Sequence, residues 1–163
     1  MKSPALSGSL LMLLCASPIA AQNERVEIRG NVPTPRSVTA QDLAALPKQT
    51  VKASDHGRPP AEYEGVRLID VLQLAGVEVG SKLRGPRLAE AVLVEARDGY
   101  RVVFALAELD SAFTSKQVLL VNKQDGAALD AEAGPWRLVV ADEKRPARWI
   151  RQVSKISVVT VKE

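Results

Sequence analysis

The chain has 163 residues and a formal net charge of +3, from 22 lysines and arginines against 19 aspartates and glutamates. Such nearly equal numbers of positive and negative residues argue against a general nucleic-acid binder. One histidine, His56, and one cysteine, Cys15, are too few for a zinc site built from those residues or for a disulfide within the chain.

Residues 1–21 predict a cleavable signal peptide. Lys2 supplies the positive charge, an apolar run follows from Leu10 to Ala16, and cleavage is expected after Ala21. The run is shorter than the roughly 20 residues of a membrane-spanning helix, and no later apolar stretch reaches that length. We therefore expect no membrane span and a periplasmic or secreted location.

Loss of this leader would remove every sulfur atom, because Cys15, Met1 and Met12 all lie within it. A lipid anchor on Cys15 is the alternative, but Leu14 stands where such a motif has a small residue. The mature chain, residues 22–163, has about 140 residues, a common size for one domain. We expect a single domain without disulfides or thiolate chemistry.

The first part of the mature chain predicts two strands around a short helix. Residues 25–29 alternate as a strand, and residues 49–54 are a second candidate. Between them, Thr39 is an N-cap with Asp42 three residues on, and Pro47 stops the helix.

The next segment predicts a loop followed by a longer helix. Residues 54–65 are rich in turn-forming residues and indicate a loop over most of their length. From Val66 to Ala75 apolar residues recur at spacings of three and four, and Gly76 stands at the C-terminal cap.

The remaining chain predicts mainly strands. Asp98-Gly99 is a strong hairpin turn between strands at 91–96 and 100–104, and a short helix is expected at 106–109. Short strands outnumber helices, so the predicted class is α+β, with a mixed, mostly antiparallel sheet. Three further strands are expected at 118–121, 137–140 and 156–161, with a turn at Asp125-Gly126.

His56 is one candidate for chemistry. It lies in the polar loop beside Asp55, and any Ser-His-acid arrangement would have to use it. A solvated loop histidine is the plain alternative. A phosphate-binding glycine loop, an HExxH motif and a serine nucleophile elbow are all missing from the sequence.

A second candidate is the basic segment near the C-terminus, in which four cations surround Trp149. Guanidinium groups suit phosphate or carboxylate, and the indole offers a flat surface to an aromatic ligand. A solvated surface with the indole in the core is the alternative interpretation. The cations are Lys144, Arg145, Arg148 and Arg151.

Two single residues complete the set of candidates. Arg137 follows Gly134-Pro135 and opens an apolar strand, where the backbone changes direction beside a possible pocket. Asp98 stands at the hairpin tip, where a turn residue is a sufficient explanation.

Taken together, four sequence blocks give the chain a family resemblance over roughly residues 25 to 161. They are YEGVRLIDVLQLAGV, DGYRVVFALAEL, VLLVNKQDGAALDAEAGPWRLVV and RPARWIRQVSKISV. The chain resembles the molybdopterin-binding domain of the sulfite-oxidase-like oxidoreductases, in a short, exported, stand-alone form.

The resemblance implies a mixed α+β fold with a pocket for the phosphate and pterin of molybdopterin. By position, Arg148 would lie near the cofactor phosphate, Arg137 would face the anionic substrate and cofactor region, and Asp98 would belong to the pocket wall. The cofactor-binding set expected from the resemblance and the spacing is Arg137, Arg148, Asp98, His56, Trp149, Lys144 and Arg145.

The chain departs from the family at two places. Catalytic members bind molybdenum through a cysteine in the loop that here reads TVKASDHGRPP, and Glu132-Ala133 stands where a histidine is frequent. Because other ligands do not reproduce a soft thiolate, oxygen-atom transfer of the usual kind is in doubt and no metal site is predicted.

Three hypotheses about function follow. The first is a periplasmic molybdopterin-binding, oxidoreductase-like protein with a weakened or lost reaction. The second is a binding or accessory module that uses the same basic pocket for a small anion or a periplasmic protein partner. The third is a hydrolase that uses His56 with Asp55.

Overall fold

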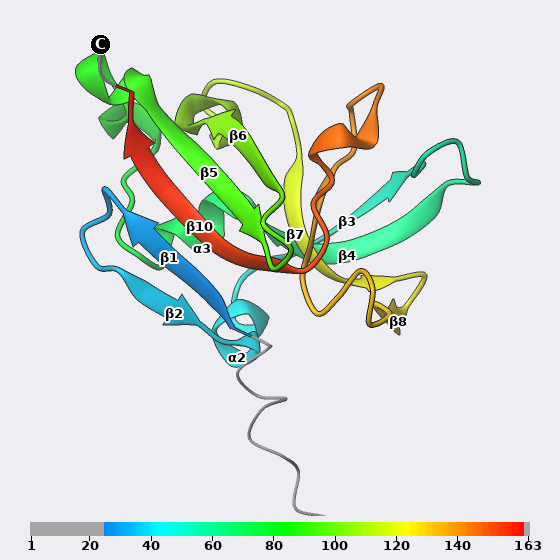
Figure 1. The fold of residues 1–163 in the computed structure, drawn as a ribbon. Coiled ribbons are helices and arrows are strands. Elements are labelled where there is room, and N and C mark those ends of the chain that lie inside the picture. The colour runs from blue at the N-terminus through cyan, green and yellow to red at the C-terminus, as the bar shows by residue number, and fades with distance from the viewer. Residues whose placement is uncertain (1–24, 162–163) are drawn as a thin grey trace, which may run out of the picture.

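The computed structural model describes residues 25–161, so the predicted leader with Cys15 lies outside the described residues. Ten strands form two five-stranded sheets, sheet A and sheet B (Figure 1). The strands are β1 (Val26–Gly30), β2 (Arg36–Val38), β3 (Lys48–Ala53), β4 (Ala61–Arg67), β5 (Glu90–Ala96), β6 (Arg101–Ala105), β7 (Val118–Gln124), β8 (Ala127–Ala128), β9 (Arg137–Val140) and β10 (Val153–Thr160).

Sheet A has the strand order β2-β1-β10-β5-β6. The last strand of the chain, β10, lies at its centre and pairs parallel with β1 and antiparallel with β5. The β5–β6 hairpin confirms the Asp98-Gly99 prediction, with Gly99 at φ +87°. Because β1 is the first strand and β10 the last, the centre of this sheet can form only after β10 has been added.

Sheet B has the order β3-β4-β7-β8, and β9 pairs with the other part of β7. All its pairings are antiparallel. The turn between β7 and β8 is at Asp125 and Gly126, which confirms the predicted turn, and both residues have positive φ. With β1–β10 as the one parallel pairing among the described strands, the mixed, mostly antiparallel α+β prediction is confirmed.

Helices are short in this fold. In α2 (Ala40–Ala44) the Thr39 side chain accepts from the backbone N–H of Asp42, and the Asp42 carboxylate accepts from that of Thr39, which is the predicted capping box. The predicted helix at 106–109 is a 3-10 turn, η3 (Leu106–Leu109). Three further 3-10 turns are η1 (Gly80–Lys82), η2 (Gly85–Ala89) and η4 (Pro146–Arg148).

The prediction was wrong for the segment around Tyr63. Residues 61–65 were expected in a loop, but they form most of β4, and helix α3 (Leu68–Gln73) begins two residues later than the expected Val66. The physical reason is pairing on both sides, since β4 lies between β3 and β7. Strand β2 was also missed because three residues carry too little periodicity.

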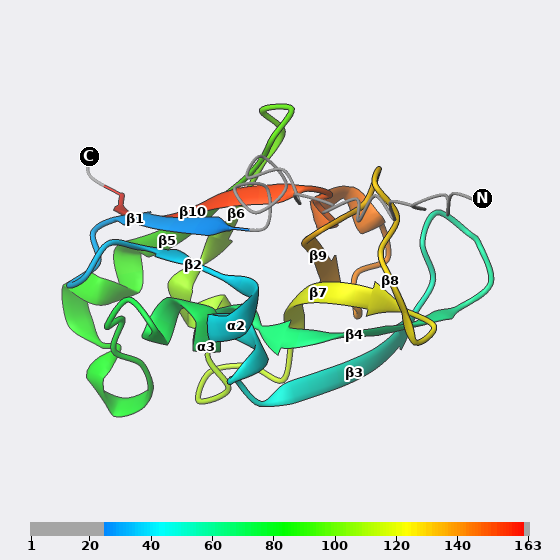
Figure 2. The ribbon, with the colours of Figure 1, turned by 90° about the horizontal axis from the view of Figure 1, so that it is seen from below.

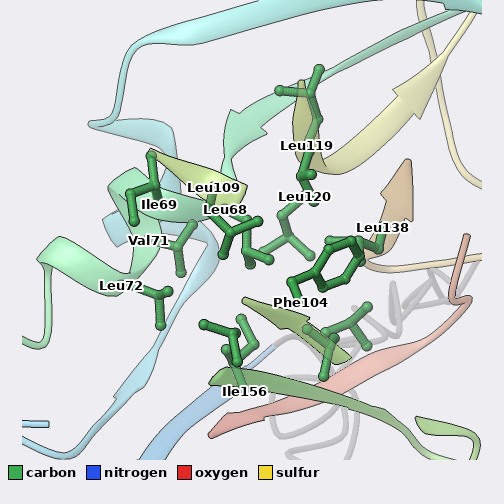
Figure 3. Packing of buried hydrophobic residues seen from close by; sticks show 14 of the residues in the cluster. Leu68, Ile69, Val71, Leu72, Phe104, Leu109, Leu119, Leu120, Leu138 and Ile156 are labelled. Carbon is green, nitrogen blue, oxygen red and sulfur yellow. The ribbon is translucent and has the colours of Figure 1, made fainter. Parts of the chain in front are cut away.

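The core lies between the two sheets, and Figure 3 shows how α3 contributes to it. Val71 and Leu72 of α3 are fully buried, as are Leu120 of β7 and Ile156 of β10. Phe104 of β6 lies in the same cluster. Each such side chain contributes about 1.5–3 kcal/mol by leaving water, so the core holds both sheets in fixed positions around the site.

The two faces of sheet A differ. One face packs on α2, α3 and the core, and the opposite face carries no helix or strand of the described chain (Figure 2). Among residues 25–161, the helices are all too short to cross a membrane.

Candidate functional site

The centre of the candidate site is a buried ion pair. Arg137 opens β9 and is 4% exposed, and its Nη2 donates to Oδ2 of Asp55 at 2.8 Å. Asp55 comes from the loop after β3 and is also buried. The fold therefore joins two segments 82 residues apart that the sequence treated as separate candidates.

His56 extends this pair towards the surface. Its Nδ1 lies 2.5 Å from Oδ1 of Asp55, while its side chain is 67% exposed and its backbone has φ +51°. Burial alone would raise the pKa of Asp55, but hydrogen bonds from Arg137 and His56 outweigh burial and lower that pKa below its ordinary value. Asp55 is thus a carboxylate held in its charged form by two donors.

The remaining surroundings of Arg137 are aromatic. Its Cζ lies 5.7 Å from the ring centre of Tyr63 and 5.5 Å from that of Trp149, both within cation–π range. Its Nε has no hydrogen-bond partner among the described residues. An unpaired buried donor costs about 1–3 kcal/mol, so an acceptor bound to this N–H would remove an energetic penalty.

A cavity of about 110 Å³ lies beside Arg137. Of its cations, Arg151 pairs with Glu132, whereas Arg58 has no carboxylate partner among the described residues. The carboxylate of Asp130 accepts from backbone N–H groups of its own turn. The lining residues are Asp55, Arg58, Pro59, Ala61, Tyr63, Gln124, Asp130, Glu132, Ala133, Arg137 and Arg151.

A second hollow, of about 250 Å³, adjoins the first and shares Arg151 with it. His56, Asp98 and Trp149 all line it, so three residues of the predicted set do meet. Asp98 also makes its turn contact, because its Oδ1 accepts from the Tyr100 N–H at 2.9 Å. Trp149 is buried and donates from Nε1 to the Val140 carbonyl at 2.8 Å.

Arg148 lies outside both hollows. Its Nε donates to Glu143 at 2.7 Å, its Nη2 donates to Glu108 at 2.9 Å, and its Cζ lies 4.2 Å from the Phe104 ring centre. The expected gathering of Arg137 and Arg148 around one guest is therefore not seen. Arg148 pairs with nearby carboxylates instead, because the turn at η4 directs its side chain towards η3 and β6.

Glu108 gives a testable pH dependence. Burial raises its pKa, but hydrogen bonds from Arg148 and Lys116 lower it to about 2. Since the folded pKa is below the unfolded one, this stabilisation is present above about pH 4.5 and is lost as pH falls towards 2. Glu108→Gln should cost at most about 3 kcal/mol at neutral pH, and the difference should shrink in urea titrations as pH falls through this window. A difference independent of pH would contradict this origin.

Lys144 and Arg145 are exposed and line neither hollow. Two lining residues were not predicted from the sequence. Tyr63 was expected in a loop, and Arg58, in the same loop, was not singled out. Asp55 was paired only with its neighbour His56, and its contact with Arg137 was not foreseen. Pairing between residues far apart in the same chain leaves no local sequence signal that could have revealed it.

The described residues offer neither a cluster of three His, Cys, Asp or Glu metal ligands nor a serine that completes a triad with His56. Within residues 25–161, no cluster of three or more His, Cys, Asp or Glu side chains could hold a metal ion. The hydroxyl nearest in sequence to His56, that of Ser54, donates to the Arg58 carbonyl. His56 and Asp55 are thus paired as a hydrolase would need, but Ser54 does not complete a triad.

Comparisons with known proteins agree with this fold. A comparison with curated proteins gave no match. Among solved structures, the chain is similar to the crystal structure of the sulfane dehydrogenase SoxCD from Paracoccus pantotrophus, with a TM-score of 0.68 and 22% sequence identity. The likeness covers 85% of this chain and 39% of that chain, so this chain spans well under half of the protein it matches.

The family model described as "Oxidoreductase molybdopterin binding domain" matches residues 15–163. This confirms the resemblance inferred from the four sequence blocks. The chain belongs to the oxidoreductase molybdopterin-binding domain family.

Proposed function

We propose that this chain is an exported, non-catalytic member of its family that binds a small oxyanion or carboxylate beside Arg137. Two observations carry the proposal: the buried Arg137 Nε has no acceptor among the described residues, and the Arg137 side chain belongs to the lining of a small cavity. Export rests on the predicted leader, residues 1–21, and predicts a mature chain beginning at Gln22 in the periplasmic or secreted fraction.

The residues present do not fit a thiolate-bound molybdenum. The loop that carries the metal-binding cysteine in catalytic relatives supplies Asp55 and His56 here, and Asp55 is committed to Arg137. Cys15 lies in the predicted leader, so the mature chain would contain no thiolate. Carboxylate and imidazole are harder donors than thiolate and do not replace it in soft-metal sites.

The pterin and its phosphate fit no better. Arg148, the expected phosphate ligand, already shares its guanidinium with Glu108 and Glu143. An apolar cavity of about 150 Å³ holds a benzene-sized guest, so the 110 Å³ beside Arg137 cannot hold a pterin by itself. A pterin there would have to extend into the adjoining hollow of about 250 Å³, past Arg151, which is paired with Glu132. We therefore derive no reaction through the cofactor.

The cavity suits a guest of a few heavy atoms. An oxyanion or carboxylate could accept from the Arg137 Nε and would lie near the unpaired charge of Arg58. Asp55 balances the charge of Arg137, and Glu132 balances that of Arg151, so Arg58 would attract the anion. The carboxylate of Asp130, which also lines the cavity, opposes this attraction in part, although it accepts from backbone N–H groups of its own turn. The role of this site would be recognition of a small anion, and a periplasmic protein could then read out its occupancy.

The test uses the protein purified from the exported fraction of a cofactor-competent host. Elemental analysis and pterin fluorescence should find neither molybdenum nor pterin, while calorimetry with sulfate and with acetate should show saturable binding of at least one. Stoichiometric molybdenum or pterin would overturn the proposal.

Arg137→Lys is the decisive variant, because lysine keeps the positive charge for Asp55 but removes the Nε donor. Loss of one such hydrogen bond should weaken anion binding about tenfold. Arg148→Lys is the matched control and should leave binding unchanged, since Arg148 lies outside the cavity. Equal binding by Arg137→Lys and the parent would refute the assigned site.

A further inference from the structure

The outer face of sheet A, on which no helix or strand of residues 25–161 lies, carries charges in an alternating row. The pairing register brings four residues from four neighbouring strands side by side, and their signs run minus, plus, minus, plus. The residues one position along each strand point into the core, so the row itself faces outward. The row is Glu27 (β1), Lys155 (β10), Glu95 (β5) and Arg101 (β6).

Beside this row, the part of the same face formed by β10, β5 and β6 carries several apolar side chains. Val103 is 52% exposed and Val159 is 39% exposed, and Ala105 is exposed as well. Leu93 is next to Val103, and Ala91 is next to Val159, across the strands. Antiparallel sheets with one solvated face normally carry polar side chains there, so a contiguous apolar group marks a contact surface.

We propose that this outer face binds a second copy of the chain, face to face, about a two-fold axis that runs along the strands between β10 and β5. Such an axis would place β10 of each copy over β5 of the other, and β1 over β6. The two sheets would then form a sandwich about 10 Å thick across the dimer.

The charge row identifies a second copy as the occupant because it is complementary to itself when reversed. The two-fold axis would place Glu27 opposite Arg101 of the second copy, and Lys155 opposite Glu95 of the second copy. Opposite signs meet throughout this row, as an isologous interface requires. In the next row, the same axis would place Leu93 opposite Ser157 and Val103 opposite Arg29 of the second copy. A hollow of about 680 Å³ lies beside Glu27, Lys155 and Glu95, and Arg25 and Arg97 also line it.

Contacts within one copy do not account for the whole row. Lys155 and Glu95 already form an ion pair at 2.8 Å, and Glu27 pairs with Arg29 at 3.3 Å. Glu27 and Arg101 stand three strand spacings apart, about 14 Å, which is too far for a direct contact within one copy. Coupling between these two residues would therefore report an intermolecular contact.

The apolar part of the face is tested by Val103→Lys. Sedimentation velocity on the exported protein should show a monomer–dimer equilibrium, and this variant should weaken dimerisation at least about tenfold. Because the Val103 side chain is exposed, the substitution leaves the core intact. Phe113→Lys is the matched control, since Phe113 is 50% exposed but lies outside these rows, and it should dimerise normally. A parent that is monomeric at all concentrations would overturn the proposal, as would a fully dimeric Val103→Lys.

The charge row is tested by reversal. Glu27→Arg alone and Arg101→Glu alone should each weaken the dimer, because each places like charges opposite one another. The double variant should regain most of the parent's affinity, and circular dichroism melting should show that all three variants fold. Failure of the double variant to recover would refute this arrangement of the two copies. None of these substitutions touches the Arg137 cavity, so anion binding and dimerisation can fail independently.

Discussion

Asp55→Ala is expected to destabilise the fold by about 3–5 kcal/mol, because it would leave the Arg137 guanidinium buried without a counter-charge. Urea unfolding followed by the fluorescence of Trp136 and Trp149 measures this loss directly. At neutral pH the parent retains the full contribution of the pair, since the pKa of Asp55 lies below its ordinary value.

Two further variants distinguish the cost of leaving a buried charge unpaired from the cost of losing an exposed ion pair. Asp55→Ala combined with Arg137→Met removes both charges, so it should recover a large part of the stability. Glu132→Ala breaks the Arg151–Glu132 pair, in which the glutamate side chain is 78% exposed, and should cost less than about 1 kcal/mol. If Asp55→Ala cost no more than Glu132→Ala, the pair would not be the anchor of this site.

Gly65→Ala is expected to be at least as damaging, at about 3 kcal/mol or more. A β-carbon at Gly65 would lie 2.2 Å from the carbonyl oxygen of Leu120 and 2.5 Å from the α-carbon of Val121. Both are backbone atoms of β7, so the strands β4 and β7 would have to separate. The same urea titration measures the effect, with expression yield as a second measure if the variant does not accumulate.

The control for Gly65 is Gly57→Ala in the loop beside His56. Gly57 has φ +76° and no atom within 4 Å of an added β-carbon, so backbone strain of about 1–2 kcal/mol is the whole expected cost. A Gly65→Ala variant as stable as Gly57→Ala would show that β7 yields more easily than the packing indicates.

The Arg137–Asp55 pair connects stability with the proposed function. The carboxylate of Asp55, from the loop after β3, accepts a hydrogen bond from Nη2 of Arg137. What remains unpaired among the described residues is the Nε donor of Arg137, a residue that also lines a small cavity. The same contact that stabilises the fold is thus part of the site proposed for a small anion.

Some features were determined by the sequence itself, because they depend on neighbours along the chain. The capping box of Thr39 and Asp42 and the Asp98-Gly99 hairpin are local arrangements, and both form as predicted. The family resemblance was also readable, since four blocks in fixed order are a property of the sequence. The absence of sulfur from residues 22–163 likewise follows from composition alone.

Only the tertiary structure decided where the charged side chains meet. Arg137 and Arg148 stand 11 positions apart, yet one turns to Asp55 and the other to Glu108 and Glu143. The strand around Tyr63 forms because β3 and β7 pair with it from both sides, which overrides its turn-rich sequence. Such contacts join residues distant in the chain, and their energies depend on burial and geometry that no local pattern encodes.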